Sequence, residues 1–254
     1  MRGVNTVFNQ FIYEHNCCDK VQSEVEKELV RILKLRYRSQ NDSPPKRPPR
    51  ILLIGPPGSG RKTQSKIIAE QFGLVRISVR DLLKTELREN PDNGAIISKC
   101  IDQGEPVPDK IVNHLVQTRL SQADCQLNGW IMDGFPESEA QVNLLKSMRI
   151  KPSVVFLLEQ NEEESIRRLS NRRIDPVTGI CYNIETDPAD DSIATRLIEA
   201  PEDKYEVVKL KFAEWSSKVA KIEDAYKIIL NIIAADKPKE IVTENLVEMI
   251  QTPS

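Results

Sequence analysis

The feature that most constrains the fold is a glycine-rich segment between an apolar run and an amphipathic run. Ile51-Leu52-Leu53-Ile54 has the continuous apolar character of a strand that is buried on both faces. Gly55-Pro56-Pro57-Gly58-Ser59-Gly60-Arg61-Lys62-Thr63 follows, and helical periodicity begins at Thr63. Glycines at these spacings let backbone N–H groups turn inward around an anion, beside a helix N-terminus whose dipole favours negative charge. A strand, loop and helix in this order predict a phosphate-binding loop.

After this loop, expected strands alternate with expected helices to the end of the chain. Such alternation predicts an α/β fold in which helices cover both faces of a parallel sheet. Residues 174–200 break the rhythm with prolines and a glycine, and we interpret them as a small inserted subdomain or lid. The further strands are expected over 74–78, 129–132, 153–158 and 227–233, and the helices over 63–72, 81–89, 95–103, 109–122, 162–171, 204–225 and 239–250.

Residues 1–49 differ in kind from the rest of the chain. The first 50 residues hold ten Lys and Arg against six Asp and Glu, whereas residues 51–254 hold 26 against 32. Residues 19–38 have the apolar spacing of an amphipathic helix, and residues 41–49 contain four prolines, which predicts a linker. Three alternatives stay open for the helix: packing on its own domain, docking to a partner, or independent movement.

Composition excludes several classes of protein. A hydrophobic share of 39% and a charged share of 29% are ordinary for a globular chain, and the net charge of −2 provides no basic field for nucleic acid. No apolar run is long enough to span a membrane, and no secretory signal is expected. The five cysteines contain no C-x-x-C pair, which argues against a zinc site and a disulfide framework and favours a reducing, cytoplasmic location.

Within the loop, Thr63 is placed to offer its hydroxyl to a nucleotide-bound Mg²⁺. Arg61 stands directly after the last glycine, where the usual motif has lysine. A guanidinium is wider than an ammonium and forked, so it binds phosphate strongly but differs as a point charge. Lys62 follows on the first helical turn.

From about residue 50 to the end, the chain resembles the adenylate kinase family of nucleoside monophosphate kinases. The resemblance is carried by GPPGSGRKTQ (55–64), ISVRDLLK (77–84), WIMDGFPESEAQ (130–141) and RLSNRRIDPVTGICYN (168–183). The form RIDPVTG, in a lid without four cysteines, is most similar to the adenylate kinase domains of cilia and flagella. The resemblance implies a P-loop kinase domain over 50–254, preceded by the N-terminal helix. It also implies a five-stranded parallel sheet, an NMP-binding insert at about 78–108 and a short lid at about 173–196.

The resemblance further implies transfer of the terminal phosphoryl group of ATP to AMP, with Mg²⁺ as the cofactor. Phosphoryl transfer depends mainly on positioning and charge neutralisation, so cationic side chains carry much of the function. The implied ATP site comprises Gly55, Gly58, Ser59, Gly60, Arg61, Lys62, Thr63 and Arg168, and the implied AMP site comprises Ser78, Lys84, Val107, Gly134, Phe135 and Gln141. The implied catalytic residues are Arg61, Arg168, Arg172, Arg196 and Asp133, and Thr63 and Asp133 are implied to hold Mg²⁺ largely through water and phosphate.

Several positions depart from the family pattern. Glu137 replaces an arginine that grips the AMP phosphate, a charge reversal that costs about 4 kcal/mol before screening at ~4 Å and an effective dielectric of ~20. Arg61 replaces the loop lysine, and Lys84 keeps the charge of an arginine but loses its fork. The other replacements are Val79 for threonine, Lys211 for a lid-side arginine and Asn183 for histidine.

Two hypotheses follow. The first is an active adenylate kinase-like enzyme, weakened by the replaced phosphate-binding cations. The second is a catalytically impaired, nucleotide-binding structural protein of the ciliary axoneme, which contacts microtubule or axonemal proteins through residues 1–49.

Overall fold

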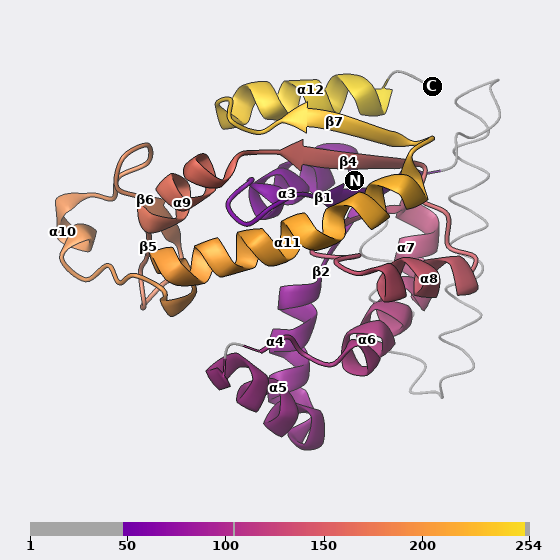
Figure 1. Ribbon diagram of the computed structural model, residues 1–254, viewed down its shortest axis with the longest axis horizontal. Helices are drawn as coiled ribbons and strands as arrows, with labels where there is room; N and C mark the ends of the chain where they lie inside the picture. The colour runs from indigo at the N-terminus through magenta and orange to yellow at the C-terminus, as the bar shows by residue number, and fades with distance from the viewer. Residues whose placement is uncertain (1–47, 104, 252–254) are drawn as a thin grey trace, which may run out of the picture. The chain divides into compact units, whose positions relative to one another are not determined.

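The strand before the phosphate loop, β1 (Arg50–Ile54), is the central strand of a five-stranded sheet in the order β2-β3-β1-β4-β7 (Figure 1). The other strands are β2 (Val75–Ser78), β3 (Trp130–Asp133), β4 (Val154–Glu159) and β7 (Leu230–Ala234). Every pairing is parallel, and the register sets Leu53 beside both Asp133 and Phe156. The predicted α/β fold with a five-stranded parallel sheet is therefore confirmed.

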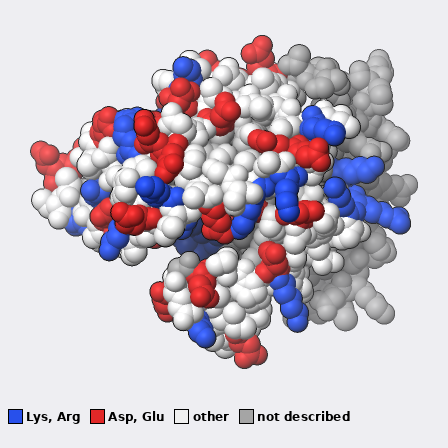
Figure 2. All heavy atoms as spheres, in the orientation of Figure 1, with Lys and Arg blue, Asp and Glu red and all other residues white. Residues whose placement is uncertain are grey.

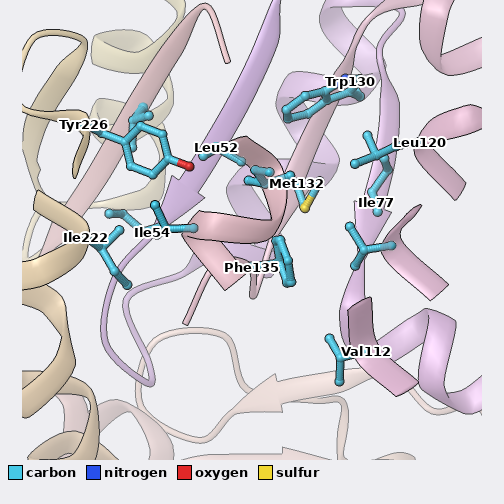
Figure 3. Close-up of a cluster of buried hydrophobic side chains, with 14 of the residues drawn as sticks. Leu52, Ile54, Ile77, Val112, Leu120, Trp130, Met132, Phe135, Ile222 and Tyr226 are labelled. Atoms are coloured by element: carbon cyan, nitrogen blue, oxygen red, sulfur yellow. The ribbon is translucent and has the colours of Figure 1, made fainter. Parts of the chain in front are cut away.

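Successive residues of β1 face opposite sides of the sheet, and helices cover both sides. Ile51 and Leu53 pack with α3 (Arg61–Phe72) and α12 (Lys239–Gln251). Leu52 and Ile54 belong to the opposite cluster, shown in Figure 3, with α6 (Asp109–Ser121), α8 (Glu139–Ser147) and α11 (Tyr205–Tyr226). All four side chains are at most 3% exposed, and burying each is worth about 2 kcal/mol. The start of the phosphate loop is thereby fixed.

The computed structural model describes residues 48–103 and 105–251. These residues belong to one compact unit that begins at Pro48. The helix expected over 19–38 and most of the linker expected over 41–49 lie outside the described residues. The two described linker residues lead directly into the sheet, because the Pro49 carbonyl accepts a hydrogen bond from the Trp130 N–H at 3.0 Å.

Two helices project from the sheet as a separate lobe below it in Figure 1. They are α4 (Val79–Glu89) and α5 (Pro91–Gln103), and they occupy the region expected for the insert. The sequence predicts a stop at Asn90-Pro91 and a new helix from residue 95, but α5 already begins at Pro91. A proline is tolerated at the first helical position, because the N–H it lacks has no partner inside the helix.

Two helices flank β3 where none was expected, α7 (Ala123–Asn128) and α8. The helix α8 has a clear start signal, since the Ser138 hydroxyl accepts a hydrogen bond from the Gln141 N–H at 3.3 Å. The expected strand 227–233 was placed too early. The helix α11 continues through Tyr226, and β7 begins at Leu230.

The region predicted as a lid follows α9 (Glu162–Ser170) and contains an antiparallel hairpin of β5 (Arg172–Ile174) and β6 (Cys181–Asn183). After it come the short helix α10 (Asp191–Ala194) and a 3₁₀ turn, η1 (Pro201–Asp203). The fully buried carboxylate of Asp175 accepts two hydrogen bonds from the Arg196 guanidinium, at 2.8 and 2.6 Å. This pair ties the return of the lid to its hairpin. None of the described helices is long and apolar enough to cross a membrane.

Candidate functional site

The phosphate loop leaves the carboxyl end of β1 and turns sharply into α3. Gly55 is enclosed so closely that a Cβ there would stand 2.7 Å from both the Leu158 carbonyl oxygen and the Ser59 Oγ. Gly60, with a φ of +85°, is the N-cap of α3, and no side chain of the described residues caps the helix. The first N–H groups of α3 are therefore left for an anion, in the geometry that favours phosphate.

A second feature of the loop also indicates a ligand. The Ser59 side chain is 2% exposed, and its hydroxyl has no hydrogen-bond partner among the described residues. An unsatisfied buried hydroxyl costs about 1–3 kcal/mol. A bound phosphate oxygen would remove that cost.

The loop lies against the helix that carries Arg168. A Cβ on Gly58 would stand 3.2 Å from the carbonyl oxygen of Ser165 in α9. One turn along α9, Arg168 donates from Nε to Glu164 at 2.7 Å and from Nη1 to the Gln160 side chain at 2.9 Å. The structure thus brings Arg168 and the loop together, with the guanidinium held in place by two acceptors.

Asp133 ends β3 beside the loop and is buried. Its Oδ2 atom accepts from the Ser65 hydroxyl at 2.6 Å and from Arg76 Nη2 at 2.8 Å. Oδ1 accepts no hydrogen bond from the residues that the structure describes. Thr63 is exposed on the first turn of α3. A free carboxylate oxygen and a hydroxyl are hard ligands, so this donor set fits a Mg²⁺ held largely through water and phosphate.

Two residues that depart from the family pattern pair with each other. Arg61 Nη1 lies 3.3 Å from Glu137 Oε1. The sequence predicts that Glu137 repels an acceptor phosphate, but part of its charge is met by the guanidinium that follows the loop. Because the Glu137 side chain is 57% exposed, the pair is worth only about 0–1 kcal/mol.

The side expected to bind AMP is a mixture of lining and supporting residues. Phe135 is fully buried in the core cluster of Figure 3, so its ring supports the site from behind. Gln141 is also buried, and it accepts from the Glu137 N–H at 2.8 Å and donates to Asp109 at 2.7 Å. Its amide therefore braces the turn after β3. Val107 packs against the same core cluster.

The remaining residues of that side lie where β2 ends and α4 begins. Ser78 is the N-cap of α4, and a Cβ on Gly134 would stand 4.0 Å from the Val79 Cβ. Burial alone would raise the pKa of Asp81 in the first turn of α4. The Arg76 guanidinium, together with the charges of Lys62 and Lys84, holds that pKa below its usual value. Lys62 and Lys84 thus add positive potential to this side of the site.

Basic residues from the insert, the hairpin and α11 meet around η1. Arg172 donates to the buried Asp203 carboxylate at 2.7 and 2.5 Å, and Arg80 lies 3.3 Å from Glu202. Burial lowers the pKa of Lys211, and the nearby charges of Arg80 and Arg172 lower it further, against the opposing effect of Glu202. Figure 2 shows the surface hollowed between the α4–α5 lobe and the rest of the described chain, with basic side chains in the hollow.

Arg196 stands apart from these groups. Its guanidinium is bidentate with Asp175 inside the lid, and this hydrogen bonding holds the pKa of Asp175 well below its usual range. In the described conformation, the Arg196 guanidinium already binds Asp175 through two nitrogens, and this pair stabilises the region predicted as a lid.

Sequence reasoning missed four residues that organise the site: Ser65, Arg76, Asp203 and Arg80. Arg76 carried a usable signal, since a charged residue inside a short, half-buried strand needs a partner. For Ser65 the signal was its spacing, because it lies four residues after Arg61 and therefore one turn further along the same face of α3. Nothing in the sequence around Asp203 shows that its side chain is buried.

A central phosphate loop at the carboxyl edge of a parallel sheet, with a helical insert on one side and a hairpin on the other, defines a P-loop protein of the nucleotide-kinase type. A family model described as "Adenylate kinase" matches residues 53–230. A relative from Zea mays, "Adenylate kinase, chloroplastic", is 33% identical over 204 residues, which cover 80% of this chain and 92% of the relative. The chain belongs to the adenylate kinase family, and this membership supports a nucleoside monophosphate kinase-like function.

Other relatives differ in how much of their length is matched. "Probable adenylate kinase 2, chloroplastic" of Oryza sativa subsp. japonica is 35% identical over 190 residues, covering 74% of this chain and 66% of the relative. "Adenylate kinase 8" of Danio rerio is 33% identical over 200 residues, covering 78% of this chain and only 41% of the relative. The chain therefore spans about two fifths of the length of that protein.

The pair between Arg172 and the buried Asp203 gives a testable prediction about stability. Replacing Arg172 with alanine leaves a buried carboxylate without its cation. We expect the free energy of unfolding to fall by about 2–3 kcal/mol, less than for a fully buried pair because the Arg172 side chain is 29% exposed. The double variant R172A/D203N should recover part of that loss, as measured by urea unfolding.

Arg167 provides the matched control. Its own side chain is 44% exposed, and its partners are the exposed Glu185 and the partly buried Glu164, so R167A should cost less than about 1 kcal/mol. Equal losses for R172A and R167A would contradict the assignment of a buried charge pair.

Proposed function

We propose that this chain transfers the terminal phosphoryl group of ATP to AMP. The rate is lowered by the ion pairs that its phosphate-binding arginines make with carboxylates of the same chain. The observation that carries the proposal is the phosphate loop itself. At the carboxyl end of β1 lie the N-terminus of α3, without a side-chain cap, and the buried Ser59 hydroxyl, without a hydrogen-bond partner, as far as residues 48–103 and 105–251 are concerned. Two independent donor features without an acceptor at one point favour a bound polyphosphate.

Each residue of the site then has a role in binding or orientation. The loop from Gly55 to Gly60, with Arg61 and Lys62, binds the phosphates of ATP, while Arg168 and Arg172 face the phosphoryl group that is transferred. The acceptor nucleotide lies on the other side, near Ser78, Lys84 and Gly134. Mg²⁺, when bound near Thr63 and the free oxygen of Asp133, neutralises phosphate charge.

The expected weakness of the reaction has a physical cause. Arg61 is paired with Glu137, Arg168 with Glu164, and Arg172 with Asp203. A phosphate must compete with a carboxylate for each of these guanidinium groups. Interactions already made in the free protein give less stabilisation of the transition state, so both affinity and rate should fall.

The direct test is formation of ADP from ATP and AMP, measured in a coupled assay on the full chain. We expect a rate at least about tenfold above that of the double variant R168A/R172A, because loss of one fixed phosphate cation commonly costs hundreds-fold. A rate no higher than that of the double variant would refute the proposal.

The replacement of Glu137 is the second test. E137R removes an anion from the acceptor side and restores a cation, so AMP affinity measured by calorimetry should rise about tenfold or more. E139R is the matched control, because Glu139 lies two residues away and pairs on the surface with Lys221 at 2.8 Å. If both variants raise AMP affinity equally, the effect is general charge and not the acceptor site.

The structural hypothesis stays a prediction. It holds that the protein works in the ciliary axoneme, within the cytoplasm, and contacts microtubule or axonemal partners through residues 1–49. Residues 1–47 lie outside the described part of the chain. The Arg61–Glu137 pair is compatible with this hypothesis as well as with a slow kinase.

A further inference from the structure

Arg76 donates hydrogen bonds to three other side chains of the site, and the proposed function does not use it. It extends from β2 and reaches three other elements. Its Nε donates to the Ser65 hydroxyl of α3 at 2.9 Å, its Nη1 to Asp81 of α4 at 2.8 Å, and its Nη2 to Asp133 of β3 at 2.8 Å. One guanidinium therefore links the phosphate-loop helix, the insert and the end of the central sheet.

The contact with Asp133 has a direct electrostatic consequence. Asp133 is 8% exposed, and both of its described hydrogen bonds fall on Oδ2. A carboxylate draws a hydrated divalent cation through its net charge. Here the Arg76 guanidinium, which stays protonated, already donates a hydrogen bond to that carboxylate. Asp81 shares this guanidinium, but the charges of Lys62 and Lys84 also act on Asp81. Much of the attraction between Asp133 and Mg²⁺ is therefore opposed by repulsion from Arg76.

We infer that Arg76 is a positioning residue that serves as a built-in counter-cation of Asp133, so that ATP binding gains little from Mg²⁺ at that carboxylate. The inference rests on the proposed function, because it concerns the same ATP site. It does not depend on catalysis, since it describes the binding equilibrium between the chain, the nucleotide and the metal.

Calorimetry on the full chain tests the inference with a non-hydrolysable ATP analogue, with Mg²⁺ and with EDTA. For the natural chain, the two affinities should differ by no more than about threefold. In R76Q, which removes the charge, the ratio of the affinity with Mg²⁺ to that with EDTA should rise about tenfold, while R76K should keep the natural ratio. R88Q is the control, because Arg88 lies on α4 and, among the residues that the structure describes, donates only to the Lys84 carbonyl.

A second measurement needs no variant and covers the case in which R76Q does not fold. By linkage, the same ratio must appear as the gain in metal affinity when the free analogue becomes bound to protein. Electron paramagnetic resonance with Mn²⁺ should therefore show nearly equal Mn²⁺ affinities for the free and the bound analogue.

Two results would overturn the inference alone. One is a tenfold or greater Mg²⁺ dependence, or Mn²⁺ gain, in the natural chain. The other is a ratio in folded R76Q that matches the natural chain. If the natural chain binds no analogue with either Mg²⁺ or EDTA, the proposed function fails and the inference fails with it.

Discussion

The burial of β1 on both faces is the constraint on which the site depends. Its neighbours β3 and β4 hold it in parallel register, and alternate side chains enter two separate core clusters. The strand therefore cannot shift without moving apolar residues out of both clusters. This fixes where the chain turns at Gly55, and with it the direction of α3. Asp133 lies beside the turn because its strand, β3, pairs directly with β1.

Around this sheet, arginines repeatedly pair with carboxylates. Six of the described arginines near the site or in the predicted lid have a carboxylate partner within hydrogen-bonding or ion-pair distance: Arg61, Arg76, Arg80, Arg168, Arg172 and Arg196. In a cleft proposed to bind two polyanions, such partners reduce the free positive charge while keeping each guanidinium oriented. The replaced positions are thus not simple losses, because Glu137 provides Arg61 with an acceptor. The chain combines a phosphate-binding loop with cations that already pair with carboxylates.

Much of the fold followed from local pattern. The strand before the loop, the order of elements and the parallel sheet were predicted because alternation and apolar runs are local signals. The sequence does not predict the helices α7 and α8, since six and nine residues respectively carry little periodicity. The phosphate-binding arginines, the loop and Asp133 could be proposed by resemblance. Their partners could not, because the approach of Arg76 to Asp133, or of Arg172 to Asp203, depends on tertiary packing between segments 31 to 57 residues apart.

The most direct measurement is calorimetric titration of the full chain with a bisubstrate analogue, in which five phosphates join two adenosines. If one cleft holds both nucleotide sites, the analogue should bind at least about 100-fold more tightly than ATP, because its second half binds at a high effective concentration. Binding no tighter than that of ATP would contradict the presence of an acceptor site beside the phosphate loop.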